Sequence, residues 1–390
     1  MLDQAAAWKA RRPHDHVFIL APHDAAAARR ERIGDIEIHR FQYLAPARLQ
    51  GLAYPAILPN IRRNPLLLAQ LPPFLWAQYR AARRLIRACD IDLVYAHWVM
   101  PQGLVARLLR ARLGTPYVLQ NHSSDVAVFD KLGRPGRAAA RGIIANAQAM
   151  FCVNREQKLH VEALFAEPER REIAAKVAVL PMGVKAEDLP RSEARSPTTF
   201  AHTFGTISRL SRKKGIDLLI EAARRLADDV PGISVAIAGE GEDGDRLRAL
   251  TANADISFRG VLTGEAKRAF FDETRFFVFP AVASGGDVEG LPVALLEALC
   301  AGKLIVASRD TNVAMLPEWE QIAPCIAYVE DPRDIGKLAA AMRGLLDLRQ
   351  AEADARSQHL RAVMSRYLWE RLIGEYLEII GSAPEPAAQV

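Results

Sequence analysis

The stretch EGLPVALLE, residues 289–297, decides how this sequence is interpreted. It places two glutamates eight positions apart, and a Gly-Leu-Pro turn leads from the first glutamate into an apolar helical pattern. A glycine-containing loop at a helix start exposes backbone N–H groups, and the helix dipole adds partial positive charge, so the segment predicts an anion site. Glu297 has apolar neighbours, which disfavours an ordinary solvated helix charge. Carboxylates at Glu289 and Glu297 can hold sugar and ribose hydroxyls separately.

An earlier loop, RLSRKKG at residues 209–215, follows the apolar run FGTIS. Arg209 offers a planar fork to phosphate oxygens, and Lys214 offers a mobile point charge. Two such cations in a strand-to-helix loop can close on a diphosphate. The alternative is that both are solvated loop charges, and this loop taken alone favours that alternative.

Short apolar runs bounded by glycine or proline alternate with helical patterns through both halves of the chain. This pattern indicates parallel sheets with helices on both faces, so we expect an α/β fold with two doubly wound, Rossmann-like domains. The polar, proline-bounded stretch 189–199 is the predicted linker. The expected divisions are a first domain at 1–190, a second domain at 200–365, a helix at 366–380 crossing back to the first domain, and a tail at 381–390.

The beginning of the chain departs from this pattern. A doubly wound domain normally opens with a strand and a glycine-rich turn into its first helix. Here QAAAWKARR (4–12) has the character of the end of that helix and leads directly into the apolar run HVFILAP (16–22). We therefore expect the first strand of the N-terminal domain and its loop to be missing.

Length and composition favour a soluble, two-domain protein. The 390 residues are half hydrophobic and one quarter charged, and no apolar run of about 18 residues predicts a spanning helix. The N-terminus has no signal-peptide pattern. The cysteines stand singly in apolar stretches and predict reduced core residues, so we expect a cytoplasmic location. They are Cys89, Cys152, Cys300 and Cys325.

The charge is unevenly distributed. Residues 1–195 carry 29 Lys and Arg against 18 Asp and Glu, while the remainder carries 22 against 28. A basic first half suggests a membrane surface or a phosphate-bearing acceptor, and a solvated arginine-rich surface is the alternative. The proline-rich stretch Leu52–Leu75, with Arg62 and Arg63 in its middle, can rest on lipid headgroups or accept a polyprenyl chain. It can equally be a loop packed on its own domain.

These motifs together resemble a known family. DVEGLPVALLEALCAGK (287–303) looks like the E-x7-E signature of the retaining glycosyltransferases of family 4, which have the GT-B fold of two Rossmann-like domains facing a cleft. GTISRLSRKKGIDLLIEA (205–222) resembles the arginine–lysine donor loop of that family. The resemblance extends from roughly Asp15 to Ile380. It includes YAHWVMPQG (95–103), NHSSD (121–125) and LPMGV (180–184).

The resemblance implies roles for residues of the second domain, which would bind a nucleotide sugar. Arg209 and Lys214 would bind the donor diphosphate and stabilise charge on the leaving nucleotide. Glu289 would hydrogen-bond the donor hexose, with the backbone of Gly290 and Leu291 near phosphate and sugar. Glu297 would hold the ribose.

In the first domain, the resemblance implies that His122 faces the donor sugar. Asp125 would brace the loop that carries His122. His97 lies where a strand ends, and a lone histidine there is more often structural. We therefore treat Asp125 and His97 as weaker, acceptor-side candidates.

The implied activity is transfer of a hexose from a UDP- or GDP-sugar to a glycan or polyprenyl-linked acceptor, in polysaccharide or cell-surface glycan synthesis. Retention of configuration needs no dedicated protein base, and we expect no cofactor and no metal. The D-x-D triplet at 90–92 precedes a strand and predicts a helix-ending turn. Glu240–Gly244 predicts a turn as well, because it lacks the spaced oxygens of a calcium loop. We expect no nucleic-acid partner, and peripheral contact with the inner face of an anionic membrane extends the cytoplasmic prediction.

Three alternative functions can be compared with this one on the sequence. A nucleotide-sugar 2-epimerase of similar fold is disfavoured by the phosphate loop and the E-x7-E spacing. A dehydrogenase would need G-x-G-x-x-G after an early strand, and the sequence has none. A binding or scaffolding subunit that keeps donor affinity without turnover remains open, because the missing first strand and loop would help to shape the acceptor side.

Overall fold

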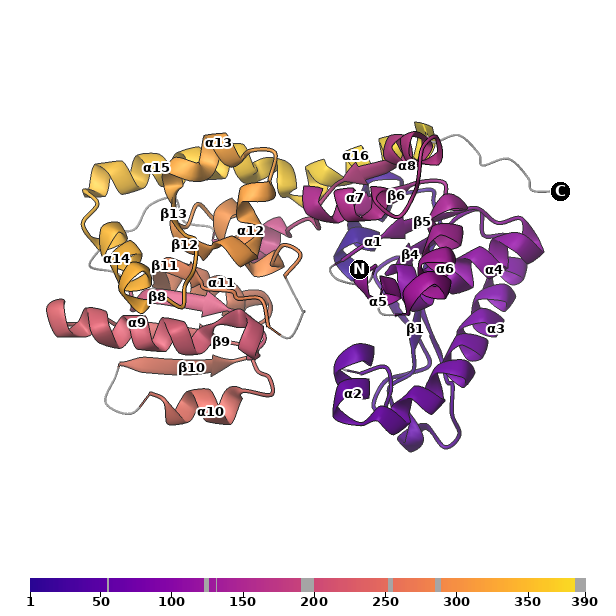
Figure 1. The fold of residues 1–390 in the computed structure, drawn as a ribbon, viewed down its shortest axis with the longest axis horizontal. Helices are drawn as coiled ribbons and strands as arrows, with labels where there is room; N and C mark the ends of the chain where they lie inside the picture. The colour runs from indigo at the N-terminus through magenta and orange to yellow at the C-terminus, as the bar shows by residue number, and fades with distance from the viewer. Residues whose placement is uncertain are drawn as a thin grey trace. The chain divides into compact units, whose positions relative to one another are not determined.

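The computed structural model describes residues 1–54, 56–122, 126–130, 132–190, 200–251, 255–284 and 289–382. The chain divides into two compact units (Figure 1). The first unit comprises Met1–Phe151, His160–Ala178 and Ile373–Val390, and the second comprises Cys152–Leu159 and Val179–Leu372. The predicted site residues are therefore divided between the units, with both histidines in the first and the stretch 209–297 in the second.

The second unit is built on a six-stranded sheet in which every neighbouring pair is parallel. Its strands are β8 (His202–Ile207), β9 (Val235–Ala238), β10 (Ile256–Gly260), β11 (Thr274–Phe279), β12 (Ile305–Ser308) and β13 (Ile326–Val329). They lie in the order β10-β9-β8-β11-β12-β13. Numbered within this unit, that is the order 3-2-1-4-5-6 of a doubly wound sheet, which confirms the predicted fold class.

Helices between and after these strands bury the apolar strand residues on both faces. They are α9 (Ile216–Asp229), α10 (Gly244–Ala249), α11 (Gly264–Glu273), α12 (Val293–Cys300), α13 (Trp319–Ile322), α14 (Ile335–Leu346) and α15 (Gln350–Met364) (Figure 1). β9 and β12 are buried at every residue. The sequence analysis missed β13.

The strands of the first unit form two separate sheets. They are β1 (Val17–Pro22), β2 (Arg30–Ile33), β3 (Ile36–Phe41), β4 (Val94–His97), β5 (Tyr117–Gln120), β6 (Met150–Cys152) and β7 (Val177–Val179). One sheet has the order β1-β3-β2 and the other β4-β5-β6-β7. Within the described part of the chain, no strand pairs with the second edge of β1 or of β4, and every residue of β1 is only half-buried.

The helices of the first unit are α1 (Leu2–Arg11), α2 (Ile57–Arg63), α3 (Leu71–Cys89), α4 (Leu104–Leu113), α5 (Ala127–Asp130), α6 (Gly133–Ala145) and α8 (Glu169–Lys176). In α3, Phe74 is fully buried, and its ring lies 5.2 Å from that of Phe41. The helix ends at Asp90, whose φ of 46° is left-handed. The predicted helix-ending turn at 90–92 is therefore confirmed.

Two helices cross the boundary between the units: α7 (Arg155–Glu162) and α16 (Trp369–Ser382). Within the first unit, the ring of Tyr376 in α16 lies 4.6 Å from that of Phe151 in β6. Helix α16 continues through Ser382 and so includes Gly381, the predicted first residue of the tail. Residues 191–199 of the linker predicted at 189–199, and residues 383–390, lie outside the described residues.

Candidate functional site

The two predicted donor loops follow neighbouring strands of the second unit. β8 and β11 pair in parallel at the centre of the sheet, so their carboxyl ends meet at one edge. This pair is also where the strand order reverses, and ligands of doubly wound sheets bind outside the carboxyl ends at such a switch point. The fold therefore brings the stretch 209–215 together with residues 280–284 and 289–290 at the expected position.

Close backbone contact fixes the first loop against the second. The 3₁₀ turn η6 (Arg212–Lys214) ends at Gly215, which has a left-handed φ of 63°. A Cβ on Gly215 would lie 2.0 Å from the carbonyl oxygen of Pro280, so only glycine fits there. The Val282 N–H donates to the Lys213 carbonyl at 2.9 Å and adds a second link between the loops.

Glu289 is buried between two lysines of the first loop. Its carboxylate oxygens lie 3.1 Å from Lys213 Nζ and 2.8 Å from Lys214 Nζ. Burial alone would raise the pKa of Glu289, but Lys214 and Lys213 outweigh it and lower the pKa below its ordinary value. Glu289 is therefore an ionised carboxylate at neutral pH, already paired with the predicted phosphate-binding Lys214.

Arg209 makes a more exposed pair. Its guanidinium lies 3.0 Å from Glu242, and the two side chains are 39% and 43% exposed. Exposed pairs of this kind contribute little stability, about 0–1 kcal/mol, and exchange partners readily. The structure thus places Arg209 and Lys214 in one loop, but each is paired with its own carboxylate.

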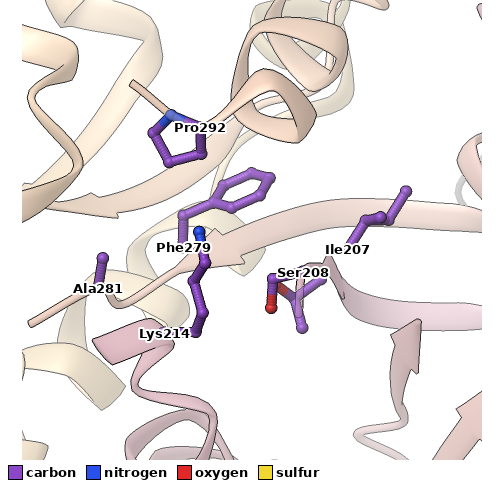
Figure 2. A pocket seen from close by; sticks show the side chains of 7 residues that line it. Ile207, Ser208, Lys214, Phe279, Ala281 and Pro292 are labelled. Atoms are coloured by element: carbon purple, nitrogen blue, oxygen red, sulfur yellow. The ribbon is translucent and has the colours of Figure 1, made fainter. Parts of the chain in front are cut away.

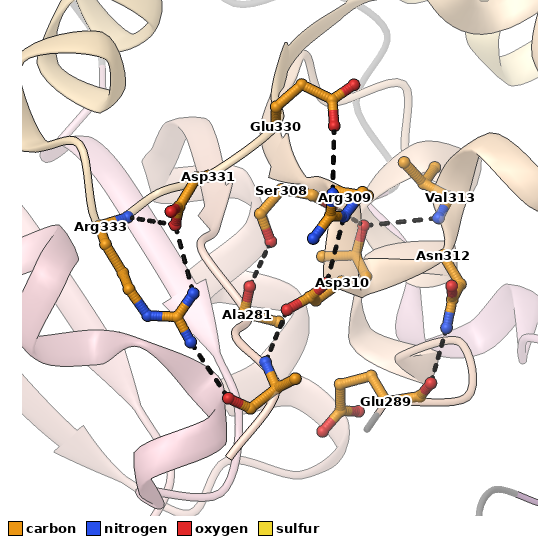
Figure 3. A network of polar contacts seen from close by, with 12 residues as sticks. Ala281, Glu289, Ser308, Arg309, Asp310, Asn312, Val313, Glu330, Asp331 and Arg333 are labelled. Carbon is orange, nitrogen blue, oxygen red and sulfur yellow. Dashed lines mark hydrogen bonds and ion pairs between the residues drawn. The ribbon is translucent and has the colours of Figure 1, made fainter. Parts of the chain in front are cut away.

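Residues after β12 hold the segment that carries Glu289 (Figure 3). Asn312 Nδ2 donates to the carbonyl oxygens of Glu289 at 2.6 Å and Gly290 at 3.0 Å. Asp310 accepts from the Ala283 N–H at 2.6 Å, on the other side of residues 285–288, which lie outside the described residues. Both sides of the loop are therefore anchored to the next strand's loop, an arrangement that the sequence analysis missed.

A small cavity lies at the carboxyl ends of β8 and β11. Figure 2 shows Lys214 reaching across it toward Phe279 and Pro292. Its volume is about 10 Å³, enough for roughly one water molecule. Pro292 is the N-cap residue of α12, and its side chain makes no hydrogen bond to the N–H groups of the first helical turn. The anion site expected at this helix start, with the backbone of Gly290 and Leu291, stays a prediction.

Glu297 lies in α12 and is buried, as its apolar neighbours predicted. Its carboxylate is 2.5 Å from Lys267 Nζ in α11, and Lys267 also lies 3.3 Å from Asp188. The sequence analysis did not identify Lys267, because nothing in the spacing of α11 marks it as the partner of Glu297.

In the first unit, two neighbouring strands bring His97 and His122 together. His97 ends β4, and its paired residue in β5 is Gln120, two positions before His122. His97 Nδ1 lies 2.9 Å from His122 Nε2, so one ring donates to the other. The structure therefore makes His97 a partner of His122 rather than a lone strand-end histidine.

Trp98 completes this cluster, which sequence reasoning had not found. Its ring lies 4.8 Å from that of His122, and its φ of 72° is left-handed. Such a backbone conformation costs about 1–3 kcal/mol in a bulky residue and is concentrated at functional sites.

Both histidines are neutral at pH 7. Burial lowers the pKa of His122 to about 4 and also lowers that of His97, to which the facing His122 adds. The pair can therefore share one N–H between the facing nitrogens without bringing positive charge to the site. Asp125, the other weak candidate, lies outside the described residues.

No group of three or more His, Cys, Asp or Glu in the described part of the chain is arranged to hold a metal ion.

This arrangement of sheets, with the paired loops at the switch point, defines the GT-B fold of glycosyltransferases. Sucrose-phosphate synthase from Thermosynechococcus elongatus superposes with a TM-score of 0.71 at 18% sequence identity, covering 98% of this chain and 92% of that one. The sequence carries the corresponding domains. Residues 2–188 match the family described as Glycosyltransferase Family 4, and residues 195–360 match that described as Glycosyl transferases group 1.

Two curated relatives are named as sugar transferases. The amylovoran biosynthesis glycosyltransferase AmsK of Erwinia amylovora is 31% identical over 46% of this chain and 44% of its own length. The GDP-mannose-dependent alpha-(1-6)-phosphatidylinositol monomannoside mannosyltransferase of Mycolicibacterium smegmatis is 27% identical over 70% of this chain and 72% of its own. The chain thus aligns with less than half of the first relative. Among the described residues, no helix has the length and apolarity needed to cross a bilayer.

Proposed function

We propose that this protein transfers a hexose from a UDP- or GDP-sugar to a glycan or lipid-linked acceptor with retention of anomeric configuration. The observation that carries the proposal is the Lys214–Glu289 pair, with its atoms 2.8 Å apart at the switch point of the second unit. Arg209 belongs to the same loop as Lys214, and Pro292 at the start of α12 lines the same small cavity as Lys214. One cluster thus offers cations to a diphosphate and a carboxylate to a sugar.

Donor binding would exchange the internal ion pairs for ligand contacts. Arg209 would leave Glu242 and, with Lys214, bind the diphosphate; Glu289 would then accept a hydrogen bond from a hexose hydroxyl. Lys213 keeps Glu289 ionised after Lys214 has moved, because it contacts the other carboxylate oxygen. Glu297 would take the ribose hydroxyls and loosen its contact with Lys267.

The proposed reaction breaks the bond between the anomeric carbon and the leaving phosphate oxygen. The acceptor oxygen forms the new bond on the same face, and its proton passes to the departing phosphate. Negative charge grows on the phosphate as the bond breaks, where Arg209, Lys214 and the N–H groups of α12 lower the barrier. Each well-placed donor contributes about 3 kcal/mol. The mechanism requires no metal ion, so EDTA should leave turnover unchanged.

The first unit would supply the acceptor side. The neutral pair His97 and His122 can hydrogen-bond hydroxyls without attracting the diphosphate. An apolar cavity of about 360 Å³ has Met100, two residues after Trp98 in the chain, in its lining. Such a cavity favours an acceptor with an apolar portion. Its lining residues include Met100, Leu104, Phe129, Leu132, Pro135 and Ile143. The names of the two curated relatives support a role in polysaccharide or glycolipid synthesis.

A donor screen tests the proposal. Thermal shift and nucleotide release would be measured with UDP- and GDP-hexoses for the intact chain, Lys214→Ala and Glu289→Ala. We expect stabilisation by at least one donor, and loss of both signals in Lys214→Ala. Lys337→Ala is a matched control, because Lys337 is 76% exposed and lies in α14, outside the donor loops. Failure of every donor to bind the intact chain would contradict the proposal.

The separation of the first unit into two sheets favours a second candidate, a subunit that binds the donor without turning it over. The same screen separates the two functions. Donor stabilisation without nucleotide release, across glycan and lipid-linked acceptors, would support the binding subunit. Release that depends on acceptor would support the transferase.

A further inference from the structure

The stretch from residue 38 to residue 89 in the first unit carries charge of one sign. It contains eight arginines and no lysine, aspartate or glutamate. Six of these arginines are exposed and have no ion pair with any residue that the structure describes: Arg48, Arg63, Arg80, Arg83, Arg84 and Arg87. Two exposed arginines outside this stretch, Arg171 and Arg343, do contact carboxylates. The positive charge of this stretch is therefore available to a partner.

Exposed apolar side chains gather in the same stretch. Of the fourteen large apolar side chains exposed among the described residues, six lie between residues 49 and 76. They are Leu49, Tyr54, Leu58, Leu66, Leu68 and Trp76. Leu66 is 81% exposed and Trp76 is 60% exposed. Exposure on this scale marks an interaction surface, because the fold has left these groups in water while burying Leu52 and Phe74 beside them.

Helix α3 organises part of this surface into one face. At about 100° per residue, Trp76, Arg80, Arg83, Arg84 and Arg87 fall within an arc of roughly 100°. All five are exposed, while the opposite face buries Phe74, Gln78 and Ile86. From Trp76 to Arg87 the face is about 16 Å long. α3 packs against α4 and the preceding 3₁₀ segment η2 (Pro65–Gln70), which carries Leu66 and Leu68 (Figure 1).

We propose that α3, with the α2–η2 segment before it, docks on an anionic lipid bilayer. Arginines interspersed with tryptophan and leucine fit the boundary between headgroups and acyl chains, where guanidinium groups contact phosphates and apolar groups enter the layer. The complete lack of carboxylates matches a partner of uniformly negative charge. This surface does not use the donor loops, so it stands whether or not the proposed transferase activity does.

Vesicle binding tests the proposal with the full chain. Co-sedimentation would compare phosphatidylcholine vesicles with vesicles containing about 30% phosphatidylglycerol, at low and high salt. We expect binding to the anionic vesicles that weakens with salt, and little binding to the neutral ones. Tryptophan emission should shift to the blue on binding. The shift should largely disappear in Trp76→Phe, which removes the indole but keeps an aromatic ring at this position.

Paired variants assign the effect to the surface. Arg83→Gln/Arg84→Gln should weaken partitioning about 30-fold, from roughly 1 kcal/mol for each arginine. The control, Arg170→Gln/Arg171→Gln in α8, removes the same charge from another exposed helix of this unit. Leu66→Ser/Leu68→Ser should weaken binding, whereas Leu159→Ser, a change at a 49% exposed leucine, should not. Equal binding of the α3 and α8 variants to anionic vesicles would overturn the proposal. Binding of the intact chain to a soluble polyanion but not to vesicles would overturn it as well.

Discussion

The donor loops of the second unit and the basic stretch of the first unit, residues 38–89, both present cations. They differ in whether those cations are paired with carboxylates. Lys213, Lys214 and Lys267 each lie within 3.1 Å of a carboxylate, and Arg209 lies 3.0 Å from Glu242. In the basic stretch, six exposed arginines have no such partner among the described residues. The donor-loop cations are therefore held in a fixed geometry, whereas the arginines of the basic stretch only attract negative charge.

That difference follows from what each region would bind. A reacting phosphate needs cations already in position when charge develops, and carboxylates and backbone contacts can hold them there beforehand. A lipid surface presents many equivalent phosphates, so flexible side chains suffice. Removing the carboxylate partner of a donor-loop cation should therefore have a large effect. The six exposed arginines of the basic stretch have no such partner to lose among the described residues.

Removing the central cation should cause the largest effect. Lys214→Met is expected to lower kcat by about 10²–10³-fold, or about 3–4 kcal/mol of lost transition-state stabilisation. Glu289 keeps Lys213 as a partner in this variant, so the fold should persist. Single-turnover release of nucleotide measures the effect, with Lys337→Met as the matched control. A loss of less than tenfold would place the reacting phosphate elsewhere.

Removing the shared carboxylate should show that the donor cations depend on their partner. Glu289→Ala leaves Lys213 and Lys214, which are only 24% and 17% exposed, without their carboxylate. We expect the free energy of unfolding to fall by about 2 kcal/mol, less than for a fully buried pair. Urea unfolding measures it. Arg343→Ala, which breaks the exposed pair with Asp229, should cost below about 0.5 kcal/mol, and equal losses would contradict the comparison.

Much of this site could be predicted from the sequence. Apolar runs bounded by glycine or proline located the strands of the second unit except β13, and EGLPVALLE marked the start of α12. The loops at 209–215 and 280–290 meet because β8 and β11 are neighbours, which the doubly wound pattern implied. The β2–β3 hairpin was missed because Arg30–Ile33 alternates charged and apolar residues too briefly.

The partners of the site residues could not be predicted in the same way. Lys213 stands beside Lys214, and no spacing rule indicates that both reach Glu289. Lys267 and Asn312 come from other loops and helices, and their contacts exist only once the sheet has formed. His97 was taken for a lone histidine because its pairing with His122 depends on the register of β4 against β5.

The histidine pair offers an intermediate case, a buried polar cluster with no charge at neutral pH. Between about pH 4 and 6.5 the unfolded chain binds a proton at His122 that the folded protein does not, because burial lowers the folded pKa to about 4. The free energy of unfolding should therefore fall by about 2 kcal/mol between pH 7 and pH 5, and be restored as the pH rises above 6.5. Denaturation at pH 5 and 7 measures this. His122→Gln should flatten the dependence, and an unchanged slope would assign it to other groups.

The substitution with the smallest expected effect leaves a donor-loop cation without a carboxylate partner, like the arginines of the basic stretch. Glu242→Gln removes the carboxylate beside Arg209, and because both side chains are well exposed, stability should change by less than about 1 kcal/mol. Donor affinity should rise about two- to fivefold, since the diphosphate no longer competes with Glu242 for the guanidinium. Titration calorimetry with the best donor checks this, with Glu273→Gln, which breaks a similarly exposed pair with Arg259, as the control. A clear loss of affinity in Glu242→Gln alone would mean that Glu242 positions Arg209 for the donor, and this pair would then act as the Lys214–Glu289 pair does.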